Sequence, residues 1–232
     1  SMIPWIQDVI DLTIPHTCAS CRARITRQPA GLCVSCINKI EVLVNGCDHK
    51  LTQRLGKRKT QIARAFALMY FEQHGVTQHL IHKIKYHNGE HLARYWGRYL
   101  GSLLQSLGVY SGVKSSLLIP VPMHKRRERR RGYNAPLHIT YGIQEVVGDK
   151  ALVCNSVLTR VKHSKSQTTA DFNQRYQRLT GSFCACPLPA KPDIIIIVDD
   201  VMTSTSTIGH CAEALRTVFS NDIHAVALAF TA

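Results

Sequence analysis

The stretch Ile-Ile-Ile-Ile-Val-Asp-Asp-Val-Met-Thr-Ser-Thr-Ser-Thr, residues 194–207, decides how this chain folds. Its first five residues are β-branched and show no polar alternation, a pattern typical of a parallel strand that is covered on both faces. We expect this strand to end at Asp199 and Asp200, so that both carboxylates reach solvent at the carboxyl edge of a sheet. Ligands of open α/β sheets bind at that edge.

A run of hydroxyl side chains follows the two aspartates: Thr203, Ser204, Thr205, Ser206 and Thr207. Apolar residues then recur at helical spacing as far as Phe219, so the run is predicted to open an amphipathic helix. Free N–H groups and the positive end of the helix dipole make such a start a phosphate site. Carboxylates that suit ribose hydroxyls, next to a phosphate turn, predict a site for a sugar phosphate.

Two other interpretations of this stretch stay open. The aspartates could only cap the following helix, with the hydroxyl run as a polar loop. An acidic receiver-type pocket is the second alternative, although paired acids lie early in such domains and here they lie near the end of the chain. Neither G-x-G-x-x-G nor G-x-x-x-x-G-K-[ST] occurs, which argues against dinucleotide and P-loop sites.

Residues 198–207 resemble the phosphoribosyl pyrophosphate (PRPP) signature V-D-D-V-x-T-T-G-x-T of type I phosphoribosyltransferases. The resemblance implies that Asp199 and Asp200 act as catalytic residues that hold the ribose diol. It also implies that residues 203–207 hold the 5′-phosphate and that Mg2+ accompanies PRPP. Thr205 stands where the family has Gly, so its side chain would either crowd the phosphate or add a hydroxyl donor.

A second segment, residues 118–134, resembles the V-P-V-P-x-H-x-x-R-x-R-x-R-G-F-N-Q stretch of ComF/GntX proteins. In that family the stretch leads from the first core strand into a pyrophosphate loop and then a helix. It implies PRPP contacts for the following residues: Val121, Pro122, Met123, Lys125 and Arg126. Ala135 takes the place of the family's Gln.

Two more segments extend the resemblance over nearly the whole chain. Residues 160–167 and 173–175 are similar to the family's R-x-R-x-T-x-x-Q and E-R-x-x-N elements, with differences at Lys162, Ser164, Gln174 and Arg178. They imply a flexible loop over the site that carries Arg160, Gln167 and Arg175. Residues 84–86, Ile-Lys-Tyr, match a lysine-tyrosine pair of the family.

Four cysteines near the amino terminus predict a metal site by independent chemistry. Cys18, Cys21, Cys33 and Cys36 form two C-x2-C pairs with eleven residues between them. Each pair places two thiolates on one tight knuckle, and four thiolates around a tetrahedral ion indicate one structural Zn2+ without an open coordination position. Two disulfides or four buried thiols are the alternatives, which a reducing cytosol disfavours. ComF/GntX proteins often carry further cysteine pairs in this region, so the resemblance implies that Cys47 is what remains of a second, lost site.

Positive charge dominates the composition, with 29 basic against 15 acidic side chains and a formal net charge of +14. Six of the seven residues 125–131 are basic, and a looser basic group lies within residues 50–64. Because arginine pairs phosphate oxygens bidentately, four side chains are predicted to contact a nucleic-acid backbone: Arg127, Arg129, Arg130 and Arg131. A solvated charged face is the alternative.

Aromatic residues near basic ones offer a second candidate surface for single-stranded nucleic acid. Tyr86, Tyr95, Trp96 and Tyr99 lie close in sequence to lysines and arginines, and bases stack on such rings. The alternative is that Tyr95 and Tyr99 pack into the core or onto the cysteine-rich segment.

The predicted organisation is a zinc ribbon with a short helix at residues 3–12 (1–50), a basic connector (51–61) and a phosphoribosyltransferase-like domain (62–232). Strands are predicted at 65–71, 116–121, 153–158 and 183–186, and a last strand at 223–230 closes the sheet. Helices are predicted at 77–107, with a break around Gly89, and at 135–147. Alternation of this kind indicates an α/β fold with a mostly parallel sheet and helices on both faces.

No run of about eighteen apolar residues occurs, so we expect no membrane insertion. No targeting segment is visible at the start of the chain, and we expect a cytoplasmic protein.

The resemblance to ComF/GntX proteins implies a role in natural transformation. There the chain would handle incoming single-stranded DNA in the cytoplasm, beside competence helicase and recombination-mediator proteins. An active phosphoribosyltransferase is the alternative, although no sequence feature names its acceptor. A scaffolding zinc-ribbon protein is a third hypothesis.

Overall fold

A computed structural model describes residues 17–25, 28–43, 46, 62–86, 89–161, 182–188, 191–203 and 206–231. Its centre is a sheet of five strands in the order β1-β7-β6-β2-β3, and every pairing in it is parallel. The strands are β1 (Ile62–Tyr70), β2 (Ser116–Pro120), β3 (Ala151–Val153), β6 (Ile194–Met202) and β7 (Asp222–Phe230). The predicted α/β class with a parallel sheet is confirmed.

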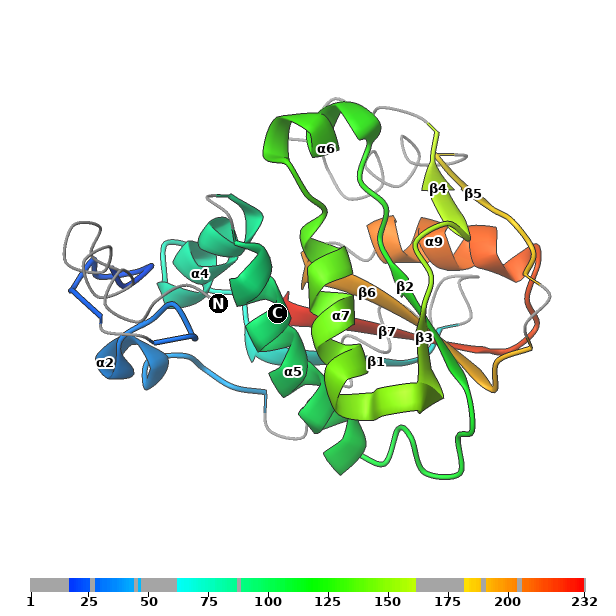
Figure 1. Ribbon diagram of the computed structural model, residues 1–232, viewed down its shortest axis with the longest axis horizontal. Coiled ribbons are helices and arrows are strands. Elements are labelled where there is room, and N and C mark those ends of the chain that lie inside the picture. The colour runs from blue at the N-terminus through cyan, green and yellow to red at the C-terminus, as the bar shows by residue number, and fades with distance from the viewer. Residues whose placement is uncertain are drawn as a thin grey trace, which may run out of the picture.

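Helices cover both faces of this sheet (Figure 1). One face carries α4 (Val76–Lys85), α5 (Glu90–Ser106) and α7 (Ala135–Val147), and the other carries α9 (Ser206–Arg216). The shorter elements are α2 (Val34–Ile37), α6 (Lys125–Arg131) and the 3-10 turn η1 (Gly148–Lys150). A separate antiparallel pair is formed by β4 (Leu158–Arg160) and β5 (Phe183–Ala185).

The apolar run of β6 fits its place in the middle of the sheet. Ile196 and Val198 face the core beneath α5 and α7, whereas Ile195 and Ile197 face the core beneath α9, and all four are 0% exposed. Each buried side chain of this size contributes about 1.5–3 kcal/mol. A strand buried on both faces therefore needs apolar residues at every position.

Helices α5 and α7 touch backbone to backbone. A Cβ atom added at Gly97 would lie 2.3 Å from the carbonyl oxygen of Ile139, and one at Gly142 would lie 2.2 Å from that of Arg94. Only glycine permits this approach, which fixes α7 and the loop before it over the sheet.

The amino-terminal segment packs on α4, α5 and the outer edge of β1. The indole N–H of Trp96 donates to the carbonyl oxygen of Ala30 at 3.1 Å, and Lys83 Nζ donates to that of Thr17 at 2.8 Å. Val42 forms an antiparallel bridge with Met69. This contact covers part of the edge strand, whose free N–H and C=O groups would otherwise be open to pairing with another chain.

One prediction about the strands is wrong. Residues 153–158 are not one strand: β3 ends at Val153, and β4 begins at Leu158 in the other sheet. The turn formers Asn155 and Ser156 separate them. The last strand predicted, 223–230, is confirmed as β7, which lies inside the sheet between β1 and β6.

Several predictions lie outside the described residues: the helix at 3–12, the connector at 51–61, and the domain boundaries at 50 and 61. Among the helices of the described residues, none is both long and apolar enough to cross a membrane.

Candidate functional site

Asp199 and Asp200 lie where β6 extends past its neighbour β2. The pairing of β2 with β6 stops at Pro120 opposite Val198, whereas β6 continues beside β7 to Met202. The strand therefore does not end at the aspartates as predicted; they lie in its last half, with one side left open by β2. Because side chains alternate along a strand, the two carboxylates point to opposite faces of the sheet.

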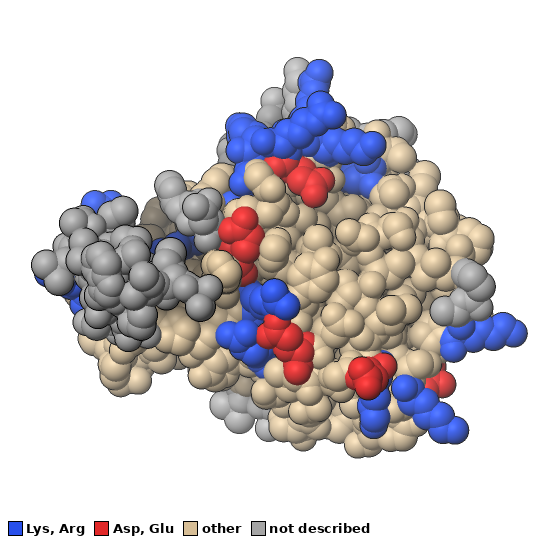
Figure 2. Space-filling model, in the orientation of Figure 1, with Lys and Arg blue, Asp and Glu red and all other residues tan. Residues whose placement is uncertain are grey.

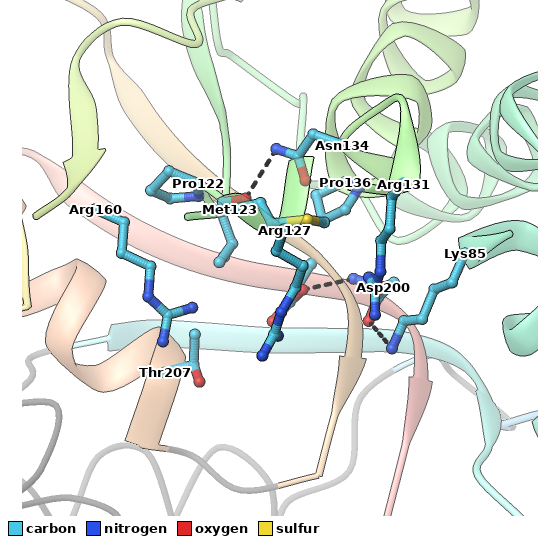
Figure 3. A pocket seen from close by; sticks show the side chains of 12 residues that line it. Lys85, Pro122, Met123, Arg127, Arg131, Asn134, Pro136, Arg160, Asp200 and Thr207 are labelled. Atoms are coloured by element: carbon cyan, nitrogen blue, oxygen red, sulfur yellow. Dashed lines mark hydrogen bonds and ion pairs between the residues drawn. The ribbon is translucent and has the colours of Figure 1, made fainter. Parts of the chain in front are cut away.

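A cavity of about 150 Å3 lies at this open side, and both aspartates line it (Figure 3). The residues around it come from α4, the loop after β2, α6, the start of α7, β4, β6 and α9. They are Lys85, Val121, Pro122, Met123, Arg127, Arg131, Asn134, Pro136, Arg160, Asp199, Asp200 and Thr207. Four are cationic and two are acidic, so the cavity suits a ligand that carries several negative charges and also hydroxyl groups.

Lys85 neutralises one of the two acids. Its Nζ lies 2.9 Å from Oδ1 of Asp200, whose side chain is only 10% exposed. The lysine is the last residue of α4, so the ion pair ties that helix to the end of β6.

Asp199 is the electrostatically strained member of the pair. Burial, and next the charge of Asp200, raise the pKa of Asp199 to about 7, against the opposing influence of Lys85 and Arg160. Its carboxylate accepts from the backbone N–H of Asp200 at 2.8 Å. A carboxyl group with this pKa changes its charge near neutral pH, and perturbed groups in a cavity mark candidate functional sites.

The loop after β2 and helix α6 divide their residues between the cavity and the outer surface. Val121, Pro122 and Met123 line the cavity. Lys125 and Arg126, predicted to lie in a pyrophosphate loop, form the first turn of α6; they are exposed and do not line it.

Arginines of α6 predicted to contact nucleic acid lie on two sides of this helix. Arg127 and Arg131, one helical turn apart, are half-buried and line the cavity. Arg131 also donates to the hydroxyl of Tyr86 at 3.1 Å, with its guanidinium 4.8 Å from the ring centre. Arg129 and Arg130 are exposed. Lys and Arg side chains accordingly gather over α6 at the top of the molecular surface in Figure 2.

The hydroxyl-rich turn opens α9 as predicted, since this helix begins at Ser206. Thr207 lines the cavity, whereas Thr203 is exposed and does not. Ser204 and Thr205 lie outside the described residues, and Thr205 is the position where the family has Gly.

Arg160 lines the cavity from the last position of β4, not from a loop. Its guanidinium lies 5.3 Å from the ring centre of Phe183 on the paired strand. Gln167 and Arg175, predicted for the same flexible loop, lie outside the described residues.

Three lining residues were not among the predicted site residues: Lys85, Asn134 and Pro136. Lys85 and Asn134 do fall within the matched family segments, so the signal was present. What the pattern could not show is that α4 and the start of α7 meet at the end of β6.

The four predicted cysteines converge on one point. The Sγ atoms of Cys18, Cys21, Cys33 and Cys36 all lie within 4.8 Å of one another, and all four thiols are free rather than disulfide-bonded. Tetrahedral Zn2+ with bonds of about 2.3 Å would place its sulfur ligands about 3.8 Å apart. Cys21 and Cys33 are 3.6 Å apart, so the cluster could hold a metal ion such as zinc.

The pKa values of the thiols in this cluster are also shifted in ways that suit a bound cation. Burial acts to raise the pKa of Cys18, but backbone hydrogen bonds, including one from the Cys33 N–H at 3.4 Å, together lower it to about 6. Burial and the neighbouring thiols raise the pKa of Cys36 to about 12. A bound cation removes the repulsion that keeps such thiols protonated.

The aromatic residues on α5 serve mainly as packing. Trp96 is 8% exposed and bonds to the amino-terminal segment, as described above. The hydroxyl groups of Tyr95 and Tyr99 form a hydrogen bond at 3.1 Å, and Tyr99 remains 51% exposed. Packing is therefore the role of Trp96 and Tyr95, whereas Tyr99 packs against both of their rings and stays half exposed.

Comparison with known proteins adds one relative. The chain is 25% identical over 217 residues to "Competence protein F" of Haemophilus influenzae, which covers 91% of this chain and 89% of that protein. No family model matches the chain. The chain is a distant homologue of competence protein F.

Proposed function

We propose that this chain is a ComF-like protein of natural transformation that handles single-stranded DNA in the cytoplasm and binds PRPP in the cavity beside Asp199 and Asp200. The observation that carries the proposal is the convergence of these two carboxylates with four cationic side chains on one cavity. The distant homology to competence protein F supports the biological role.

The charges around the cavity fit the parts of PRPP. Its phosphates take Arg127, Arg131, Arg160 and Lys85, because guanidinium and ammonium groups pair phosphate oxygens. Its ribose hydroxyls are donors for Asp199 and Asp200. Mg2+ is bound in proteins through one or two carboxylates and substrate phosphates, so these aspartates also suit the ion that accompanies PRPP.

The outer side of α6 fits a nucleic-acid backbone. Lys125, Arg126, Arg129 and Arg130 are exposed there, while the other two basic residues of the helix face the cavity. This exposed side offers four phosphate contacts. For single strands the log affinity then falls with log salt at a slope of about 3.

The cysteine cluster supplies the third part of the proposal. A structural Zn2+ held by the four thiolates would contribute folding energy to the amino-terminal segment. That segment carries Thr17, which holds Lys83 two residues before the cavity residue Lys85. The metal therefore supports the helix that closes one side of the cavity.

An active phosphoribosyltransferase is the alternative, favoured by the raised pKa of Asp199 beside the cavity. In that reaction positive charge develops on the sugar ring as pyrophosphate leaves. The two carboxylates would stabilise that charge, and Arg127 and Arg131 would hold the leaving group in place.

A binding assay with a labelled single strand tests the DNA role. The double variant Arg129→Ala/Arg130→Ala should bind more weakly, with a salt slope lower by about 1.4 than that of the unmodified chain. The matched control is Lys114→Ala/Lys150→Ala, which removes two exposed charges away from α6. Equal loss in both double variants would mean that only net charge matters and that α6 is no DNA site.

Turnover separates the two candidate functions. Pyrophosphate release from PRPP in the presence of nucleobases or amines, abolished by Asp199→Asn/Asp200→Asn, would favour the enzyme. PRPP binding without release, together with salt-sensitive DNA binding, would favour the competence role.

A further inference from the structure

Asn134 holds a buried acceptor that no described residue uses. The residue precedes α7 and is 8% exposed. Its side-chain nitrogen donates to the carbonyl oxygen of Val121 at 3.1 Å, and its side-chain oxygen has no hydrogen-bond partner within the part of the chain that the structure describes. A buried acceptor without a donor lowers stability, so such an atom calls for an explanation.

The orientation of this amide is fixed by its partner. A backbone carbonyl oxygen can only accept, so the NH2 group must face Val121 and Oδ1 must face the other way. Figure 3 shows this bond as a dashed line, with the amide oxygen turned toward the side chains that line the cavity.

Helix α7 offers no donor to this oxygen. An asparagine before a helix normally accepts from the N–H of the second or third helical residue. The second residue here is Pro136, which has no N–H. The third is Leu137, whose N–H donates to the backbone oxygen of Asn134 at 3.1 Å. The side-chain oxygen thus receives no hydrogen bond from α7, and Asn134 lines the cavity.

We propose that Asn134 is a ligand-binding residue of this cavity, whose Oδ1 accepts a hydrogen bond from an O–H group carried by the bound PRPP complex. The inference rests on the proposed function. Phosphate oxygens act as acceptors and cannot serve as this donor. Two sources of O–H remain: a ribose hydroxyl, or a water molecule on the accompanying Mg2+, which keeps several waters when bound.

Three ligands separate these sources in calorimetric titrations: Mg2+ with PRPP, Mg2+ with pyrophosphate, and ribose 5-phosphate alone. Asn134→Ala should weaken binding of Mg2+ with PRPP by about fivefold, as expected for one hydrogen bond. A ribose donor predicts the same loss for ribose 5-phosphate and none for pyrophosphate. A donor on magnesium-bound water predicts the reverse.

The matched control is Gln144→Ala. Gln144 lies on the same helix, and its side-chain nitrogen donates to the backbone oxygen of Ala151 at 2.9 Å, away from the cavity. This variant should lose the corresponding backbone bond while its affinity for all three ligands stays within about twofold of the unmodified value.

A spectroscopic readout on the unmodified chain covers the case in which Asn134→Ala does not fold. The side-chain carbonyl 13C signal of Asn134 should shift when Mg2+ and PRPP are added, and that of Gln144 should not. An unchanged Asn134 signal, or equal affinity of the unmodified chain and Asn134→Ala for all three ligands, overturns the inference while leaving the proposed function intact. If no ligand binds the unmodified chain, the proposed function and this inference both fall.

Discussion

Breaking the ion pair between Lys85 and Asp200 should destabilise the fold measurably. The variant Lys85→Met keeps most of the aliphatic stem and removes the charge. At 2.9 Å two unit charges attract by about 6 kcal/mol at an effective dielectric constant near 20, and desolvation offsets most of this. Removing one partner costs about 3–5 kcal/mol when the pair is fully buried and about 0–1 kcal/mol when it is exposed.

The exposure of the two side chains places this pair between those limits. Asp200 is 10% exposed and Lys85 is 26% exposed. We therefore expect Lys85→Met to lower the free energy of unfolding by about 2 kcal/mol at pH 8. The variant also leaves both aspartates without their nearest lysine, so the pKa of Asp199 should rise further.

A double-mutant cycle with Asp200→Asn isolates the pair. Urea unfolding of Lys85→Met, Asp200→Asn and the double variant should give a coupling energy of about 2 kcal/mol, because the two groups are in direct contact. Lys150→Met, at an exposed lysine, is the control and should change stability by less than about 0.5 kcal/mol. Additive effects of Lys85→Met and Asp200→Asn would refute the reasoning.

Three further predictions concern other parts of the molecule. The pKa of Asp199 is about 7 in the folded chain and about 4 in an unfolded one, so the free energy of unfolding should fall as pH rises from about 4 to 7. Asp199→Asn should therefore unfold at a higher temperature than the unmodified chain at pH 8. This difference in unfolding temperature should close at pH 5. Gly97→Ala places a methyl group 2.3 Å from the Ile139 carbonyl oxygen and should cost more than about 2 kcal/mol in urea unfolding, whereas Gly101→Ala, on the same helix and with its nearest atoms 3.1 Å away, should cost less. Cys21→Ser alters an exposed ligand with little packing and should lower both the zinc content measured by atomic absorption and the unfolding temperature; unchanged zinc content would contradict a four-thiolate site.

The central strand could be predicted from the sequence because its residues leave little choice. An unbroken β-branched run fits only a position covered on both faces, which is where β6 lies. The same reasoning applies to β7, whose apolar residues run without alternation from Ala225 to Phe230 and which lies inside the sheet. Asn155 and Ser156 likewise carried the signal that separates β3 from β4.

The division of α6 could be predicted only in part. Helical periodicity places Arg127 and Arg131 on one side, but it does not say which side faces the cavity. That depends on how Arg131 packs on Tyr86, from a segment more than forty residues earlier in the chain. Lys85 was missed for the same reason, since its contact with Asp200 joins residues far apart in sequence.

Titration of the chain with Mg2+ and PRPP in a calorimeter tests most directly whether the cavity beside Asp199 and Asp200 binds PRPP. The account predicts saturable binding by the unmodified chain, binding weakened by at least about tenfold in Arg127→Ala/Arg131→Ala, and unchanged binding in Arg129→Ala/Arg130→Ala. Equal affinity of the two arginine variants, or no binding by the unmodified chain, would contradict it.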